Sequence, residues 1–422
     1  MSRLTRSAGL GLAVALGLGF TACSNQGPGD DPASDPASGK VTITYSNFIS
    51  NGGNESNLAD IVAAFNKDNP DIVVELETLP YADYFTALQT DLAAGSAADV
   101  FDIEYANYAT YQANGALAAL EGVDRSVYQP SLADAYATGG VQYALPSSFS
   151  NVVLFYNKDL FDAAGVAYPT ADWTWADEKA AAEKIADPAA GVWGDYQPIS
   201  YNEFYKAVAQ AGGQFLNADA SSVAFDSPAG LAAAEWLTQK SGTVMPTVEQ
   251  GAGTPDFDSN LFSQGKLGLW HTGIWMFGSL ADATFQWDIA VEPGDSRPAS
   301  AMFSNALAVS ADSQHKAEAQ KWAEFMSSSR AMVDVRLRAG WELPPIADQS
   351  QLDAYLDAGQ PANRQAVFDS LDAVVLAPSI GQNQAQMQDI VTEELTEAAA
   401  GRKSAEEAVQ SAAQRVEPLL QR

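Results

Sequence analysis

The pattern of apolar and polar side chains predicts alternating strands and helices in the first part of the chain. Residues 41–48 alternate in character, as a half-buried strand does. The next apolar side chains follow at helical spacing, at Leu58, Ile61, Val62 and Phe65. The alternation continues, with strands expected at 72–79 and 99–103 and helices at 81–94 and 108–114. Such alternation predicts an α/β fold with parallel strand pairs, in which ligands bind beyond the carboxyl ends of the strands.

A second series of elements begins near Asn151. Strands are expected at 152–156, 266–270 and 302–310, and helices at 201–211, 231–240 and 315–327. A further helix, rich in alanine, is expected to end near Pro188, and residues 388–420 predict a helical tail. At 422 residues the chain exceeds one ordinary hydrophobic core, so we expect two domains.

The N-terminus has the pattern of a secretory signal. Arg3 and Arg6 precede a small, apolar run at 7–20, which is shorter than the roughly 20 residues of a spanning helix. Cys23, the only cysteine, follows Phe20-Thr21-Ala22. This placement resembles the lipobox of bacterial lipoproteins, which implies that Cys23 is acylated and becomes the mature N-terminus. Phe20 stands where that pattern prefers leucine, and the alternative is an ordinary signal peptide followed by a free thiol.

The segment after Cys23 predicts a tether. Residues 24–39 are mostly Pro, Gly, Ser and Asp, a composition that cannot bury enough apolar surface to fold. Acyl chains followed by a flexible tether hold a folded body at a membrane surface. No later stretch is long and apolar enough to span a bilayer. We therefore expect the protein at the cell membrane, lipid-anchored on its extracytoplasmic face.

Charge and residue usage exclude several functions. The net charge is −31 at pH 7, which disfavours nucleic acid and anionic lipid as partners. A single cysteine permits no internal disulfide and no cysteine-rich metal site. Because His271 and His315 are the only histidines, a histidine-rich zinc site is nearly excluded. We expect no cofactor and no metal.

Five segments, spread over most of the mature chain, resemble one family, the extracellular solute-binding proteins of ABC importers in their sugar-binding branch. These segments are 65–74, 98–101 with 111–117, 154–161, Pro169 with 173–175, and 262–268 with Gly273-Ile274-Trp275. The resemblance implies a two-lobed fold of the periplasmic-binding-protein type, with a ligand cleft and hinge strands between the lobes. It also implies hinge closure on the ligand. The implied crossings between the lobes lie near 147–151, 300–303 and 349–357.

The resemblance and the composition together predict the following organisation. Residues 1–22 form the signal peptide, 23–39 the lipid-anchored tether, 40–148 and 301–350 the two parts of lobe 1, and 149–300 and 351–422 the two parts of lobe 2, the last part being the C-terminal helices. The family further implies an ABC transporter permease as partner. We expect the protein to be a monomer and not an enzyme.

A sugar site needs aromatic planes for the ring face and fixed polar groups for the hydroxyls. Trp275 matches the stacking tryptophan of the family's Gly-x-Trp turn, and the alternative is a core side chain. Tyr201 and Asn202 begin a helix that lines the cleft in the family, although Asn202 could instead cap that helix. Trp341 follows Gly340 in a loop. Five further tryptophans, at 173, 175, 193, 236 and 322, are interpreted as packing residues.

Further candidates lie at strand ends and at the hinge. Asp102 and Glu104 end a strand, and carboxylates accept strong hydrogen bonds from hydroxyl groups. The alternative is a solvated loop. The other candidates offer an amide, a hydroxyl or a ring, and they are Asn47, Phe48, Asn107, Ser148, Ser150 and Asn151. Residues 381–384 carry no aromatic side chain where maltodextrin binders have one, which argues against a long glucan.

The sequence therefore predicts a protein that captures a carbohydrate, as a mono- or short oligosaccharide, and delivers it to an ABC permease. The main alternative is a polyamine-binding protein, because ammonium groups bind carboxylates and aromatic faces. A glycoside hydrolase needs two carboxylates that flank the scissile bond. Asp102 and Glu104 come from one strand end and cannot easily do so.

Overall fold

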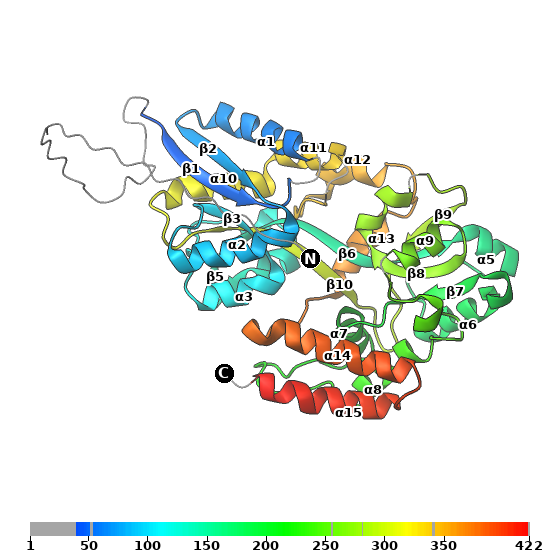
Figure 1. Ribbon diagram of the computed structural model, residues 1–422. Helices are drawn as coiled ribbons and strands as arrows, with labels where there is room; N and C mark the ends of the chain where they lie inside the picture. Colours follow the sequence, from blue (N-terminus) through cyan, green and yellow to red (C-terminus); the bar gives the residue numbers. More distant parts are fainter. Residues whose placement is uncertain (1–38, 51–53, 255, 281, 340–341, 421–422) are drawn as a thin grey trace, which may run out of the picture.

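The protein is described here from a computed structural model, in residues 39–50, 54–254, 256–280, 282–339 and 342–420. Cys23, the tether up to residue 38 and Trp341 lie outside the described residues. The elements form two groups, which we call the first and second lobe, joined by the long strands β6 and β10 (Figure 1). No helix in the described part of the chain is both long enough and apolar enough to cross a membrane.

The first lobe is built around a twisted sheet with helices on its faces (Figure 1). Its elements are β1 (Val41–Asn47), α1 (Glu55–Asp68), β2 (Ile72–Thr78), α2 (Tyr81–Ala94), β3 (Val100–Glu104), α3 (Tyr105–Ala113), α4 (Pro130–Ala135), β4 (Ala137–Thr138), β5 (Val141–Gln142), α10 (Lys316–Ser328) and α11 (Arg330–Ala339). The apolar stripe of α1 is buried at Leu58, Ile61 and Phe65, as the helical spacing predicts. Gly95, with φ of +69°, ends α2 in the left-handed conformation that favours glycine.

The second lobe contains shorter strands and the C-terminal helices. Its elements are α5 (Lys158–Ala164), α6 (Trp175–Ile185), β7 (Trp193–Tyr196), α7 (Tyr201–Gln210), α8 (Pro228–Thr238), α9 (Phe257–Ser263), β8 (Leu267–Gly273), β9 (Trp287–Ala290), α14 (Gln384–Ala399) and α15 (Ala405–Val416). The segment after α11 adds α12 (Asp353–Leu356), α13 (Gln365–Asp369) and β11 (Val374–Val375).

Within the described residues, nine strands form one sheet whose main order is β2-β1-β3-β10-β6-β8-β7. β1 pairs in parallel with β2 and β3, whereas β10 (Ser300–Val309) runs antiparallel to β3. β6 (Ala144–Asn157) passes from one lobe to the other: its residues 144–151 pair with β10, and residues 152–156 pair with β8. β6 and β10 therefore carry the backbone between the lobes.

The predicted α/β class is confirmed, and the strands and helices predicted between residues 41 and 114 are all present. Two later predictions need correction. The strand expected at 152–156 is the second part of the 14-residue β6, which is buried throughout and so lacks the alternation that marks a half-exposed strand. The single helical tail is two helices, because Gly401 adopts a φ of +70° and Ser404 starts a new helix with a capping box to Glu407.

Candidate functional site

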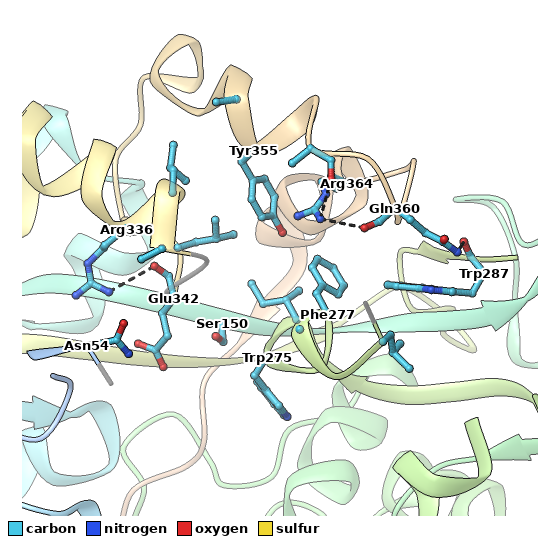
Figure 2. A pocket seen from close by; sticks show the side chains of 18 residues that line it. Asn54, Ser150, Trp275, Phe277, Trp287, Arg336, Glu342, Tyr355, Gln360 and Arg364 are labelled. Carbon is cyan, nitrogen blue, oxygen red and sulfur yellow. Dashed lines mark hydrogen bonds between the residues drawn. The ribbon is translucent and has the colours of Figure 1, made fainter. Parts of the chain in front are cut away.

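An opening of about 640 Å³ lies next to the strands that join the two lobes, and residues of both lobes line it. Figure 2 shows the side chains around it. The first lobe and the loop after α11 supply Asn54, Arg336 and Glu342, β6 supplies Ser150, and the remaining wall includes Ile274, Trp275, Phe277, Trp287, Tyr355, Gln360 and Arg364. A volume of this size is typical of small-molecule sites.

Trp275 is held in the opening by the turn that follows β8. The side chain is 51% exposed, and its ring makes an edge-to-face contact with Phe303 of β10 at 5.5 Å between centroids. Its ring also covers Gly273, where a Cβ atom would lie 1.9 Å from a ring carbon. Gly273 is therefore needed for the ring to fold back over the turn. An exposed and fixed indole of this kind offers a plane on which a ligand can stack.

Glu342 is fixed by polar side chains from both long strands. Asn305 of β10 donates to Glu342 Oε2 at 2.8 Å and to Ser148 Oγ at 3.1 Å, and Ser148 of β6 also donates to Glu342. Behind it, Arg336 Nη1 donates to the backbone oxygen of Glu342 at 3.4 Å. In Figure 2, the carboxylate of Glu342 points to the same side of the long strands as Trp275, whereas Tyr355 and Arg364 lie on the other side. The carboxylate of Glu342 is therefore a fixed hydrogen-bond acceptor on the side of the long strands where the Trp275 ring lies.

A second carboxylate, Glu104, stands where β3 ends and α3 begins. The hydroxyl of Tyr81 donates to Glu104 Oε1 at 2.9 Å. Burial raises the pKa of Glu104, the bond from Tyr81 lowers it, and the nearby charge of Glu342 raises it again. Tyr81 is 56% exposed and rests on Phe48, with 5.3 Å between ring centroids. The first lobe thus presents two mutually repelling carboxylates beside exposed aromatic rings.

Four of the residues expected from the sequence are buried and have partners inside the protein. Asn47 donates to Glu77 O at 3.1 Å and accepts from Ser50, and Asn151 donates to Val367 O at 2.9 Å. Tyr201 donates to Pro378 O at 2.8 Å, and Asp102 accepts from Tyr45 at 2.7 Å. Each of these side chains therefore has a partner inside the protein, whereas Asn151 Oδ1 and Asp102 Oδ2 have no hydrogen-bond partner among the described residues. Contact of these four residues with a solute stays a prediction.

The other expected residues are divided between the opening and places outside it. Ser150 and Trp275 line the opening directly. Ser148 donates a hydrogen bond to Glu342, which also lines it, and the charge of Glu342 raises the pKa of Glu104. Phe48 lies beneath Tyr81. Asn107 lies on α3 with no hydrogen-bond partner for its Oδ1 among the described residues, and Asn202 lines a separate hollow with Gln388 and Asp389.

Sequence reasoning missed several residues of the opening. They are Asn54, Arg336, Glu342, Tyr355 and Arg364 in its wall, with Tyr81, Phe303 and Asn305 next to it. One signal was available, because Glu342 directly follows Trp341 in the loop that the sequence singled out. Arg336 lies inside a helical pattern and carried no signal of its own.

A second cluster of charged side chains lies buried in the core of the second lobe. It contains the carboxylates of Glu178, Asp195, Glu203 and Glu292 together with Lys206, Lys240 and His271. Glu178, Asp195 and His271, or Glu203, His271 and Glu292, have ligand atoms close enough to hold a metal ion. Lys206 and Lys240 already form ion pairs with these carboxylates at 2.5–2.7 Å, so the donor set is balanced by ammonium groups and fits a metal poorly.

Comparison with known proteins gives concordant matches. A family model described as bacterial extracellular solute-binding protein matches residues 51–333. A binding protein of Brucella abortus is 25% identical over 342 residues, covering 77% of this chain and 80% of the relative. The arabinooligosaccharide-binding protein of Bacillus subtilis is 30% identical over 156 residues, 35% of each chain. An ABC substrate-binding protein of Listeria monocytogenes, solved with cycloalternan, has a TM-score of 0.78 and 39% identity, and the match covers 90% of this chain and 99% of that one.

Proposed function

The chain belongs to the bacterial extracellular solute-binding protein family, and from this premise we propose that it captures a short oligosaccharide outside the cytoplasm and hands it to an ABC importer. The match confirms the family that the sequence segments resembled, and members of this family bind solutes rather than act as enzymes. The observation that carries the proposal is the exposed, fixed indole of Trp275, which lies on the same side of the long strands as the carboxylate of Glu342.

The chemistry of the opening suits a sugar. A pyranose ring presents C–H groups on its face and hydroxyls at its edge, so it can stack on Trp275 and donate to Glu342 and Glu104. Ser148 and Asn305 hold Glu342 in one position, which reduces the entropy lost when a hydroxyl binds. The similar Listeria protein was solved with cycloalternan, which makes cycloalternan the first ligand to test.

A second candidate ligand is a polyamine. Two carboxylates that repel each other, Glu104 and Glu342, lie near the exposed rings of Tyr81 and Trp275. An ammonium group would relieve that repulsion and bind the aromatic faces.

Titration calorimetry with cycloalternan, maltotetraose, arabinooligosaccharides and spermidine separates these candidates. We expect one of the sugars to bind and to raise the melting temperature. At a hundred times its dissociation constant, a ligand adds about 2.7 kcal/mol of stability. Binding of spermidine alone would contradict the carbohydrate proposal and favour the polyamine. Binding of neither class would contradict both.

We also propose that the protein is a monomer attached to the membrane through acylated Cys23. The support is the sequence alone, namely the apolar segment before Cys23 and the polar tether after it. Cys23→Ser should release the protein into the medium or leave the signal uncleaved, as fractionation and mass spectrometry of the N-terminus would show. Ser24→Ala, one position further on, should stay in the membrane fraction. Membrane retention of a processed Cys23→Ser protein would rule out the anchor.

A further inference from the structure

The opening has a second wall, on the side of the long strands away from Trp275 and Glu342. Figure 2 shows Tyr355 and Arg364 next to each other on this side. Both come from the segment after α11, and Phe277, from the turn that follows β8, lines the same opening. None of these three side chains belongs to the sugar contacts proposed above.

Arg364 is held in this wall by two aromatic rings and two backbone oxygens. Its guanidinium lies over the ring of Tyr355, 4.6 Å from the centroid, and over the ring of Phe277, at 5.1 Å. One of its nitrogens, Nη2, donates to Ala358 O at 3.2 Å and to Gln360 O at 3.1 Å. The guanidinium is therefore fixed between the two rings.

Arg364 makes no ion pair with any residue that the structure describes, and its side-chain hydrogen bonds go to backbone oxygens alone. The buried carboxylate of Asp288 is engaged elsewhere, since it accepts from Asn363 N at 2.8 Å and lies 3.8 Å from Lys158 Nζ. The carboxylate of Glu342 points to the other side of the long strands. In a protein with a net charge of −31, such a cation at the wall of an opening is unusual.

Three hydrogen-bond donors of this wall have no partner among the described residues. They are Arg364 Nε, Trp287 Nε1 and the hydroxyl of Tyr355. Guanidinium and indole N–H groups can only donate. Burial raises the pKa of Tyr355, against the lowering effect of Arg364, so the hydroxyl keeps its proton at neutral pH. Because buried donors are rarely left without an acceptor, the group that completes this wall must offer acceptor atoms.

We propose that this wall is a second binding site, for a small organic anion that presents a carboxylate to Arg364 and an apolar body to the rest of the opening. A guanidinium binds a carboxylate through two parallel N–H groups, which suits a planar anion. The opening, at about 640 Å³, has room for an organic molecule, and its other walls include the apolar side chains of Ile274, Leu280, Leu337 and Leu343. The inference does not rest on the proposed function, because Trp275 and Glu342 take no part in it.

Benzoate is the probe for this site, and calorimetric titration in about 0.15 M salt limits the long-range effect of the net charge. Benzyl alcohol and benzylamine replace the carboxylate with a neutral and a cationic group, and phosphate is an anion without an apolar body. We expect benzoate to bind about tenfold or more tightly than each of the other three, the usual effect of hydrogen bonds to a charged group. Equal binding of benzyl alcohol, or a preference for benzylamine or phosphate, would overturn the proposal.

Variants of the wall and a matched control separate a specific contact from a general effect of charge. Arg364→Gln should lower benzoate affinity by about tenfold or more, and Arg364→Lys, which keeps the charge without the planar fork, should lower it less. Arg338→Gln removes the same charge from a side chain of α11 that is 63% exposed, and it should leave the affinity unchanged. Equal losses in Arg364→Gln and Arg338→Gln, or no loss in Arg364→Gln, would overturn the proposal.

Arg364 also holds the backbone at Ala358 and Gln360, so a second variant guards against a loss of folding. Tyr355→Phe keeps the ring under the guanidinium and removes one donor of the wall. It should weaken benzoate binding with little change in melting temperature, and unchanged affinity in both Tyr355→Phe and Arg364→Lys would overturn the proposal.

NMR locates the probe and keeps this inference separate from the proposed function. The Nε–H signal of Arg364, identified by its absence in Arg364→Lys, should shift when benzoate is added to the full chain without sugar. An unmoved signal at saturating benzoate would place the probe elsewhere and overturn the inference. If no sugar binds while this signal shifts, the proposed sugar ligand fails and the anion site stands.

Discussion

At the scale of single residues, Trp275 is the side chain on which sugar recognition depends most. Trp275→Ala should weaken sugar binding by about 1–3 kcal/mol, the free energy of burying one large apolar side chain. The melting temperature should change little, because the ring is half exposed and lies outside the core. Calorimetry and thermal unfolding of the same variant measure both quantities.

Two further variants control this prediction. Gly273→Ala places a Cβ atom where the Trp275 ring lies, so it should reproduce the loss of affinity with the indole still present. Trp270→Ala, in the same strand, removes a ring that is 1% exposed and should cost about 3–5 kcal/mol of stability. A large loss of stability with unchanged affinity in Trp275→Ala would mean that Trp275 is a core residue.

Single residues also show how far sequence alone could go. Asp102 and Glu104 are two residues apart and so point to the same face of β3. In the structure Asp102 is fully buried and accepts from Tyr45 of β1, whereas Glu104 is the last residue of β3 and accepts from the exposed Tyr81 of α2. The sequence could identify a strand end with two carboxylates, but the depth of each one is set by side chains of other elements, which spacing along the chain does not reveal.

At the scale of elements, β8 and α7 are joined by the buried charge cluster of the second lobe. His271 of β8 contacts Glu292 through Nδ1 at 2.6 Å and Glu178 through Nε2 at 3.0 Å. Carboxylates can only accept, so both ring nitrogens carry protons. Burial lowers the pKa of His271, but the charges of Glu178 and Asp195 outweigh burial and raise it to about 9.

This raised pKa predicts a loss of stability in alkali. The folded pKa lies above the ordinary histidine value of 6.5, so the contribution is fully present below pH 6.5 and is lost as pH rises through about 9. Urea unfolding between pH 6 and 10 should show the decline, and His271→Gln should flatten it. His315→Gln leaves the cluster intact and should keep the full decline, and an equal slope in both variants would contradict this assignment.

The helices and strands were predictable where one face is buried and the other is exposed to solvent. Periodicity identified α1, β2 and α2 because each of them combines core positions with exposed ones. β6 was only half recognised, because all of its 14 residues are buried and Ser147, Ser148 and Ser150 interrupt its apolar pattern. Ser148 bonds to Glu342 and to β10, and Ser150 lines the opening, contacts that only the tertiary structure reveals.

At the scale of the whole molecule, the two lobes and the opening between them predict closure on the ligand. Hinge motion about β6 and β10 would bring the second-lobe turn that carries Trp275 towards Glu104 and Glu342. Small-angle scattering should therefore show a smaller radius of gyration when a sugar that binds is added. Trp275→Ala at the same sugar concentration should stay closer to the ligand-free value, and an unchanged radius in the saturated wild type would contradict closure.

The strand order has a consequence for how the chain is made. β10 lies between β3 and β6, so the sheet of the first lobe lacks an inner strand until residues 300–309 have emerged from the ribosome. Until then β3 has an unpaired edge, and the contacts that complete the lobe span about half of the polypeptide. Pairing over such distances in sequence is slow. A nascent chain that cannot complete its first lobe early stays extended for longer, which suits a protein that must thread through a secretion channel before it folds.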